Sequence, residues 1–240
     1  MADLERHTYS RLTFDGRAAE PAWSPDGRWV AYYGGDGIYR RRADGSGQAV
    51  RVWTYGQPIP SSFSPDGRFL LADTSPSRGQ NDLWLVPLDA PATARVLVQS
   101  PSAEGQGVVS PDGRWVAYMS NMSGRPEVYV SSFPAAAEKW QISNNTGFEP
   151  RWSRDGREIF YRDGNGNLFA LPVEPGDSFA VGPPVRLFGG MRTGDNNKTY
   201  GVRPDGTFVT LSLAVEKAVD RVNLVLGWDR EVARLLAPPR

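Results

Sequence analysis

One short phrase recurs five times along this chain, and each copy is followed by alternating apolar residues. The phrase is Ser-Pro-Asp-Gly-Arg or a close variant, and its copies begin at Ser24, Ser64, Ser110, Ser153 and Arg203. Successive copies are separated by 40, 46, 43 and 50 residues. A period of this size is typical of repeat architectures, in which each repeat is one small structural unit. The recurrence therefore predicts a single domain, residues 1–240, built from similar units.

Each unit has the pattern of four short strands separated by tight turns. In the first unit, Pro-Asp-Gly at 25–27 supplies the fixed φ, the side-chain acceptor and the positive φ that a tight turn uses. Alternating residues at 29–32, 38–40 and 49–53 follow as strands. Four antiparallel strands at this period describe a propeller blade. The predicted fold is an all-β propeller of five four-stranded blades, at about 19–54, 58–99, 104–143, 147–188 and 197–227.

The fifth unit lacks an outer strand, and the N-terminal segment 7–14 has the pattern of a spare one. We expect this segment to pair with Val222–Leu226, because closing the ring removes an open sheet edge that invites aggregation. Apolar residues on one helical face then predict a short C-terminal helix over 228–236.

Composition excludes several classes of site. The formal net charge is zero, which gives no basic surface for nucleic acid, and the chain has no cysteine for thiolate chemistry. No apolar run approaches the ~20 residues of a membrane helix. The first 14 residues lack the apolar core of a signal peptide. We expect a monomer without membrane insertion in this chain, and the compartment stays unassigned.

Several segments resemble the repeat of TolB-like propellers. One of them is 11–16 followed by 20–27. A second resemblance is to the propellers that follow many bacterial serine/threonine kinase domains and related sensory proteins, and it is carried by Ser110–Tyr118, Gly124–Val130 and Phe133-Pro134. The resemblance covers nearly the whole chain and implies a sensory or interaction role, with an extracytoplasmic location allowed for a longer protein. It also implies six blades as the usual number, whereas five units are counted here, and the kinase signatures are absent.

The repeated aspartates have a structural interpretation. Asp26, Asp66, Asp112, Asp155 and Asp205 each stand in a Pro-Asp-Gly or equivalent turn. Aspartate side chains accept hydrogen bonds from nearby backbone amides in such turns. With one aspartate per blade on one rim, we expect turn-building residues and no shared metal.

A better candidate site lies four residues before each motif start or its equivalent, at Glu20, Pro60, Gln106, Glu149 and Thr199. If the strand entering each turn is innermost, these residues surround one mouth of a central channel. We predict that Glu20, Gln106, Glu149 and Thr199 contact a ligand or partner there. Their oxygens would suit a hard cation such as calcium, held by Glu20 and Glu149, although no metal or cofactor is assigned. The structural alternative is that the glutamates are solvated or bond a neighbouring strand.

Two functions remain open from the sequence. The first is a non-catalytic scaffold that binds a protein, peptide or small ligand, with the irregular segments 74–80 and 192–198 as recognition loops. The second is a glycosidase-like hydrolase that uses paired carboxylates near the channel, drawn from Glu20, Glu104 and Glu149. Fold analogy alone supports the hydrolase.

Overall fold

The computed structural model describes residues 2–3, 8–9, 11–14, 16–77, 80–191, 193, 198–203 and 205–210. The regular secondary structure among these residues is β-strand, apart from one short 3₁₀ turn, η1 (Pro91–Thr93). They contain four four-stranded antiparallel sheets and two two-stranded ones. In the same ranges, no helix is long and apolar enough to cross a membrane.

The four large sheets follow one another along the chain. The first holds β3 (Ala19–Trp23), β4 (Trp29–Tyr33), β5 (Ile38–Arg42) and β6 (Val50–Trp53). The second holds β7 (Ile59–Phe63), β8 (Phe69–Ser77), β9 (Gln80–Pro87) and β10 (Arg95–Val98). The third holds β11 (Glu104–Val109), β12 (Trp115–Ser120), β13 (Glu127–Ser132) and β14 (Lys139–Gln141). The fourth holds β15 (Phe148–Trp152), β16 (Glu158–Arg162), β17 (Leu168–Pro172) and β18 (Val185–Phe188), and a hairpin of β19 (Tyr200–Val202) and β20 (Phe208–Thr210) comes last.

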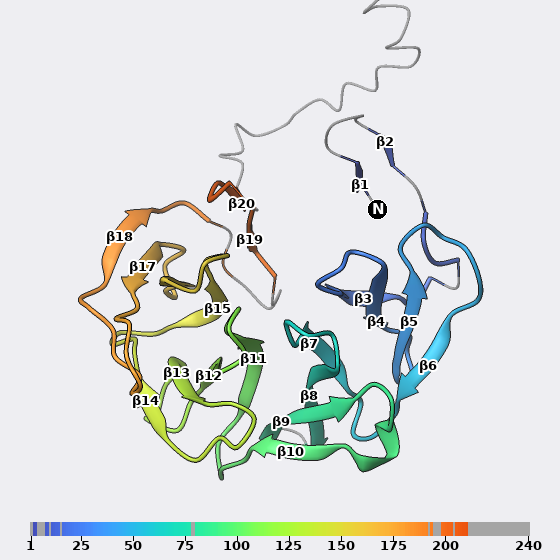
Figure 1. The fold of residues 1–240 in the computed structure, drawn as a ribbon, viewed down its shortest axis with the longest axis horizontal. Helices are drawn as coiled ribbons and strands as arrows, with labels where there is room; N and C mark the ends of the chain where they lie inside the picture. The colour runs from blue at the N-terminus through green and yellow to red at the C-terminus, as the bar shows by residue number, and fades with distance from the viewer. Residues whose placement is uncertain are drawn as a thin grey trace, which may run out of the picture.

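The sheets are arranged around a common centre (Figure 1). The first strand of each unit, β3, β7, β11, β15 and β19, faces that centre, while β6, β10, β14 and β18 lie at the periphery. Within each large sheet, every strand pairs with its neighbour in sequence. This arrangement confirms the predicted all-β propeller class. The number of blades stays a prediction, because 211–240 lie outside the described residues.

The hydrophobic core is divided among the interfaces between consecutive sheets. A single sheet has two faces and buries them only against its neighbours, as repeat architectures require. Each of the four clusters contains buried residues of two consecutive units: Ala31 with Leu70, Leu83 with Val116, Ala117 with Ile159, and Phe160 with Tyr200. Each cluster therefore joins one unit to the next and holds the strands that surround the centre.

The Ser-Pro-Asp-Gly segments form the turns that the sequence predicts. In the first unit, the N–H of Gly27 donates to the carbonyl of Ser24 over 3.0 Å, and Gly27 has a φ of 68°. The hydroxyl of Ser24 and the N–H of Arg28 both donate to Asp26 Oδ1, at 2.6 and 3.0 Å. These bonds hold the pKa of Asp26 below its usual value, the serine hydroxyl having the largest effect. The turn-building interpretation of the repeated aspartates is confirmed.

The N-terminal segment differs from the predicted closing strand. Thr8 and Tyr9 form β2 and pair with Ala2 and Asp3 of β1, and 11–14 are not in a strand. The carbonyl of Leu12 accepts a hydrogen bond from the Arg41 side chain at 2.9 Å. The predicted partner Val222–Leu226 and the predicted helix 228–236 lie outside the described residues, so pairing with the last unit stays a prediction.

The described part of segment 74–80 belongs to β8 and β9, with Thr74 opposite Asp82, Ser77 opposite Gln80, and a shift of register between Thr74 and Ser77. Residues 78–79 lie outside the described residues. Thr74 is buried, which suits a β-branched residue in a paired strand. Recognition by this segment stays a prediction.

Candidate functional site

The innermost strands of the four large sheets share a bulge close to the centre of the molecule. Their pairing with the second strand shifts register just after the first residues, and Glu20, Gln106 and Glu149 stand at three of these bulges. Each of the three has a left-handed backbone, with φ of 52°, 60° and 53°. Bulges of this kind re-aim a side chain away from the normal alternation of a strand. The side chains of Gln106 and Glu149 accordingly reach the neighbouring unit.

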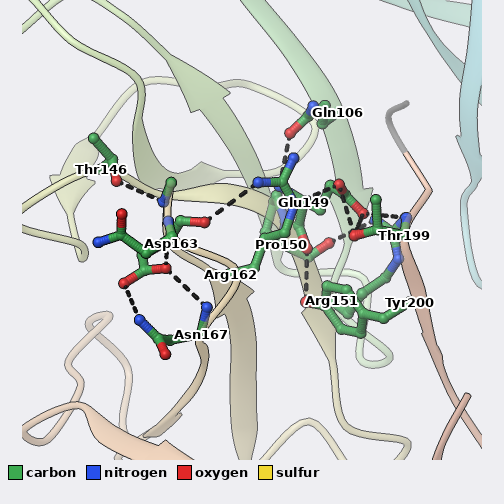
Figure 2. A network of polar contacts seen from close by, with 12 residues as sticks. Gln106, Thr146, Glu149, Pro150, Arg151, Arg162, Asp163, Asn167, Thr199 and Tyr200 are labelled. Carbon is green, nitrogen blue, oxygen red and sulfur yellow. Dashed lines mark hydrogen bonds and ion pairs between the residues drawn. The ribbon is translucent and has the colours of Figure 1, made fainter. Parts of the chain in front are cut away.

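A chain of hydrogen bonds runs from unit to unit through these positions. The N–H of Gln106 donates to Asp73 Oδ2 over 2.9 Å, and the N–H of Glu149 donates to Gln106 Oε1 over 2.7 Å. The N–H of Thr199 donates to Glu149 Oε2 over 2.6 Å. Figure 2 shows Glu149 at the middle of this network. At each step a backbone donor on one unit meets a side-chain acceptor on the preceding unit.

Glu149 also forms a buried ion pair. Its Oε1 lies 2.7 Å from Nε of Arg162, and neither side chain has more than 5% of its surface exposed. The hydroxyl of Thr199 donates to the same carboxylate, and the hydroxyl of Tyr200 donates to the Glu149 carbonyl at 2.7 Å (Figure 2). A buried carboxylate is tolerated when its oxygens are this fully hydrogen-bonded. Glu149 therefore joins three units.

The four residues predicted to contact a ligand fall into two groups. Gln106, Glu149 and Thr199 are brought together in the network above, and all three are buried. Glu20 keeps 27% of its side chain exposed and lies beside Lys198. The structural alternative, in which a glutamate bonds a neighbouring strand, describes Glu149. Ligand binding by these residues stays a prediction.

Lys198 is the central residue that the sequence interpretation missed. Its ammonium donates to the carbonyls of Pro21 at 2.6 Å and Pro60 at 3.2 Å, and lies 3.9 Å from Oε2 of Glu20. Its one sequence signal is its place directly before Thr199, within the segment 192–198 that the sequence predicts to be a loop. Its partners are 177 and 138 residues away, which no local pattern reveals.

A small cavity, here called the central pocket, lies among these groups. Its volume is about 10 Å³, roughly the space for one water molecule. The residues that line it are Glu20, Ile59, Pro60, Ser61, Asp73, Gln106, Arg151 and Lys198. The pocket is thus polar, carries charges of both signs, and is too small for an organic ligand without movement.

Burial shifts the titration of two residues that line the central pocket. It raises the pKa of Asp73 to about 6, although the N–H of Gln106 and the hydroxyl of Ser61 favour the carboxylate. It lowers the pKa of Lys198 to about 8, while the charge of Glu20 favours the ammonium. Desolvation disfavours the charged form in both cases. At neutral pH Lys198 is protonated.

The remaining candidate acid of the hydrolase hypothesis is enclosed. Glu104 has no exposed surface, and its Oε1 accepts hydrogen bonds from the hydroxyls of Ser100 and Ser120 at 2.5 and 3.0 Å. Burial raises the pKa of Glu104. Throughout the described part of the chain, no three His, Asp or Glu side chains gather as a metal site would require.

Comparison with known proteins supplies the family likeness. No protein-family model matches the chain. Over 165 aligned residues, 65% of the chain, it is 29% identical to the Tol-Pal system protein TolB of Francisella tularensis subsp. mediasiatica, and the same identity holds for TolB of subsp. tularensis. The chain is a TolB-like β-propeller domain. The alignment spans 37% of the TolB sequences, so it covers little more than a third of those proteins.

Solved structures support the same fold. The TolB-like domain superposes on a putative TolB from Agrobacterium tumefaciens with a TM-score of 0.61 and 17% identity, over 82% of this chain and 76% of that one. TolB from Acinetobacter baumannii gives 0.59 and 20%, over 79% and 47%. An oligogalacturonate lyase in complex with manganese gives 0.61 and 14%, over 90% and 64%. At these identities the likeness is one of fold, and one fold hosts unrelated functions.

Proposed function

We propose that this TolB-like domain is a non-catalytic scaffold that binds another protein, as the interaction part of a bacterial envelope or signalling assembly. The supporting relatives are named as components of the Tol-Pal system. In this chain, the carboxylates Glu104 and Glu149, which a hydrolase would need, are enclosed and hydrogen-bonded. On this proposal the domain contributes a rigid surface and no reacting group.

The observation that carries the proposal is that some polar groups near the centre are buried between units while others stay exposed. Gln106, Glu149 and Thr199 hold the units together and are buried. Around the central pocket, charged groups of both signs stay accessible on Glu20 and Lys198, whose side chains are 27% and 26% exposed. Half-buried Arg151 lies beside them, with its guanidinium 5.8 Å from the ring of Tyr200. Arginine held over an aromatic ring on a rigid framework is a good anchor for a protein partner.

Charge reversal at Arg151 tests the proposal. The partner that the wild-type domain captures from an envelope extract would be identified by mass spectrometry, purified and titrated against three proteins. We expect R151E to weaken its Kd at least tenfold. R157E is the matched control, because Arg157 is 84% exposed and lies in the turn at the far end of β15. Equal binding by wild type, R151E and R157E would place the contact elsewhere and overturn the proposed surface.

The hydrolase hypothesis gains no support from a specific contact. It needs two carboxyl groups facing a substrate about 5–9.5 Å apart. Two of its three candidates have no exposed surface, and Glu20 is paired with Lys198. We therefore advance the scaffold alone.

A further inference from the structure

The junction between the first and second sheets lacks a hydrogen bond that later junctions have. At the third and fourth units and at the last hairpin, the central backbone N–H donates to a side chain of the unit before it. The corresponding residue of the second unit is Pro60, which has no N–H. Glu20, on the first unit, therefore has no such donor to accept from at Pro60.

Lys198 supplies donors at this junction from a distant part of the chain. It stands two residues before β19, yet its ammonium bonds the carbonyl of Pro21 in β3 and that of Pro60 in β7. Glu20 lies 3.9 Å from the same nitrogen. An ammonium carries three donors and no acceptor, so it suits a place surrounded by carbonyl and carboxylate oxygens. One side chain thus connects the first sheet, the second sheet and the last hairpin.

The oxygens around Lys198 favour a small cation that can donate hydrogen bonds. Two are backbone carbonyls with defined directions, and the charge of buried Asp73 adds attraction to that of Glu20. Calcium requires six to eight oxygen ligands at about 2.3–2.6 Å, whereas the hydrogen-bonded and ion-paired oxygens around the Lys198 nitrogen are two carbonyls at hydrogen-bond distance and one Glu20 oxygen at 3.9 Å. Arg151 also lines the pocket, and its positive charge disfavours a divalent cation there.

We propose that the central pocket is a binding site for a primary ammonium group, and that Lys198 is its resident occupant. The site is made by the carbonyls of Pro21 and Pro60 and by the carboxylate of Glu20, and the charge of Asp73 adds attraction. When the lysine side chain is shortened, the space and the oxygens accept a small free alkylammonium ion. This inference does not rest on the proposed protein-binding function, because it concerns how the units are held.

Rescue of K198A by a small amine tests the site. We expect K198A to unfold at a lower temperature than wild type. Methylammonium chloride then raises the Tm of K198A in a saturable way, by roughly 3–6 °C at about twenty times its Kd. Tetramethylammonium chloride at equal ionic strength has no N–H to donate and gives no such rise. Equal effects of the two salts on K198A, or the same methylammonium effect on wild type, would overturn the proposal.

Matched variants separate the site from general salt effects. K139A removes an exposed lysine elsewhere and should show no amine-specific shift. E20Q/K198A lacks a carboxylate of the site, and we expect its methylammonium affinity to fall at least fivefold. Retention of full affinity in E20Q/K198A would contradict the assigned oxygens.

A covalent version keeps the test decisive if K198A does not fold. The chain has no cysteine, so K198C carries a single thiol that can be alkylated in denaturant before refolding. Alkylation with 2-bromoethylamine returns an ammonium at nearly the original distance, and iodoacetamide adds a neutral amide. We expect the first adduct to refold with a Tm within about 2 °C of wild type. If both adducts refold with the same Tm, the ammonium has no role, and the protein-binding proposal is unaffected.

Discussion

Asp73 accepts the backbone N–H of the next unit, a bond that in later units is accepted by the residue equivalent to Pro60. At the third and fourth units, Gln106 and Glu149 accept an N–H from the next unit. Pro60 has no side-chain acceptor for this purpose. Asp73 lies on the paired strand, opposite Ile59, and accepts the N–H of Gln106 instead. To accept this hydrogen bond the carboxylate of Asp73 is buried, and burial disfavours its charged form because hydration is lost.

That burial predicts a specific pH dependence. The pKa of Asp73 is about 6 in the folded protein against 3.8 for its usual value. A raised folded-state pKa stabilises the fold fully below about pH 3.8, and the stabilisation is lost as pH rises through about 6. D73N keeps an acceptor oxygen but does not titrate. We expect the free energy of unfolding of wild type, relative to D73N, to fall by about 2–3 kcal/mol between pH 4 and 7.

Urea unfolding of both proteins across this pH range measures the difference. Parallel stability profiles for wild type and D73N would show that Asp73 does not carry a raised pKa. A difference that grows in the opposite direction would show that the hydrogen bonds from Gln106 and Ser61 outweigh burial.

At the scale of the element, we expect the repeated turn to contribute different amounts to the free energy of unfolding in different units. In the third unit, Ser110 Oγ donates to Asp112 and accepts the N–H of Trp115 at 2.9 Å, and both Ser110 and Trp115 are buried. The same serine in the fourth unit, Ser153, accepts the N–H of Glu158 at 2.9 Å in an exposed setting. The geometry is shared, and only the access of water differs.

We therefore predict that S110A and S153A differ in cost. S110A leaves the N–H of Trp115 buried without an acceptor, which costs about 1–3 kcal/mol of unfolding free energy. S153A leaves the N–H of Glu158 able to bond water, and its cost stays below about 1 kcal/mol. Chemical denaturation of the two variants gives the comparison. Equal costs would mean that the serine acts through the turn itself and not through the buried donor.

Element positions were predictable because the turn chemistry and the period-2 patterns are local. The Pro-Asp-Gly turn at 25–27 marks where β3 ends and β4 begins, and the alternation after it gives the strand. The roles of Glu149 and Lys198 were not predictable in the same way. A bulge turns Glu149 toward the next unit, and Lys198 finds partners far away in sequence. Thr8 and Tyr9 pair with Ala2 and Asp3, a local pairing that the sequence pattern did not reveal, and the pairing of segment 7–14 with the last unit stays a prediction.

At the scale of the molecule, two kinds of contact hold consecutive units together. Apolar clusters fill the interfaces between sheets, and a chain of hydrogen bonds links the units near the centre. Apolar contacts are tolerant of small shifts, whereas the polar chain needs each donor opposite its acceptor. Glu149 links the most residues in that chain, because it forms hydrogen bonds with Gln106, Arg162 and Thr199.

E149Q is therefore predicted to weaken the connection between units more than the units themselves. It removes the charge that pairs with buried Arg162, at a cost on the order of 3 kcal/mol. Glu127 offers a matched control. It is equally buried, but its partners lie in the turn between β12 and β13 or in the loop that follows β14: Arg125, Ser143, Asn145 and Thr146. E127Q should destabilise the third sheet without reaching β19–β20.

Hydrogen exchange followed by mass spectrometry distinguishes the two effects. In E149Q, we expect amide exchange in Tyr200–Val202 and Phe208–Thr210 to rise at least tenfold over wild type, because Thr199, directly before β19, loses its charged acceptor. In E127Q, the rise should be confined to Glu127–Ser132 and the strands beside it. If both variants accelerate exchange in β19–β20 to the same extent, the units unfold as one body, and Glu149 has no special part in joining them.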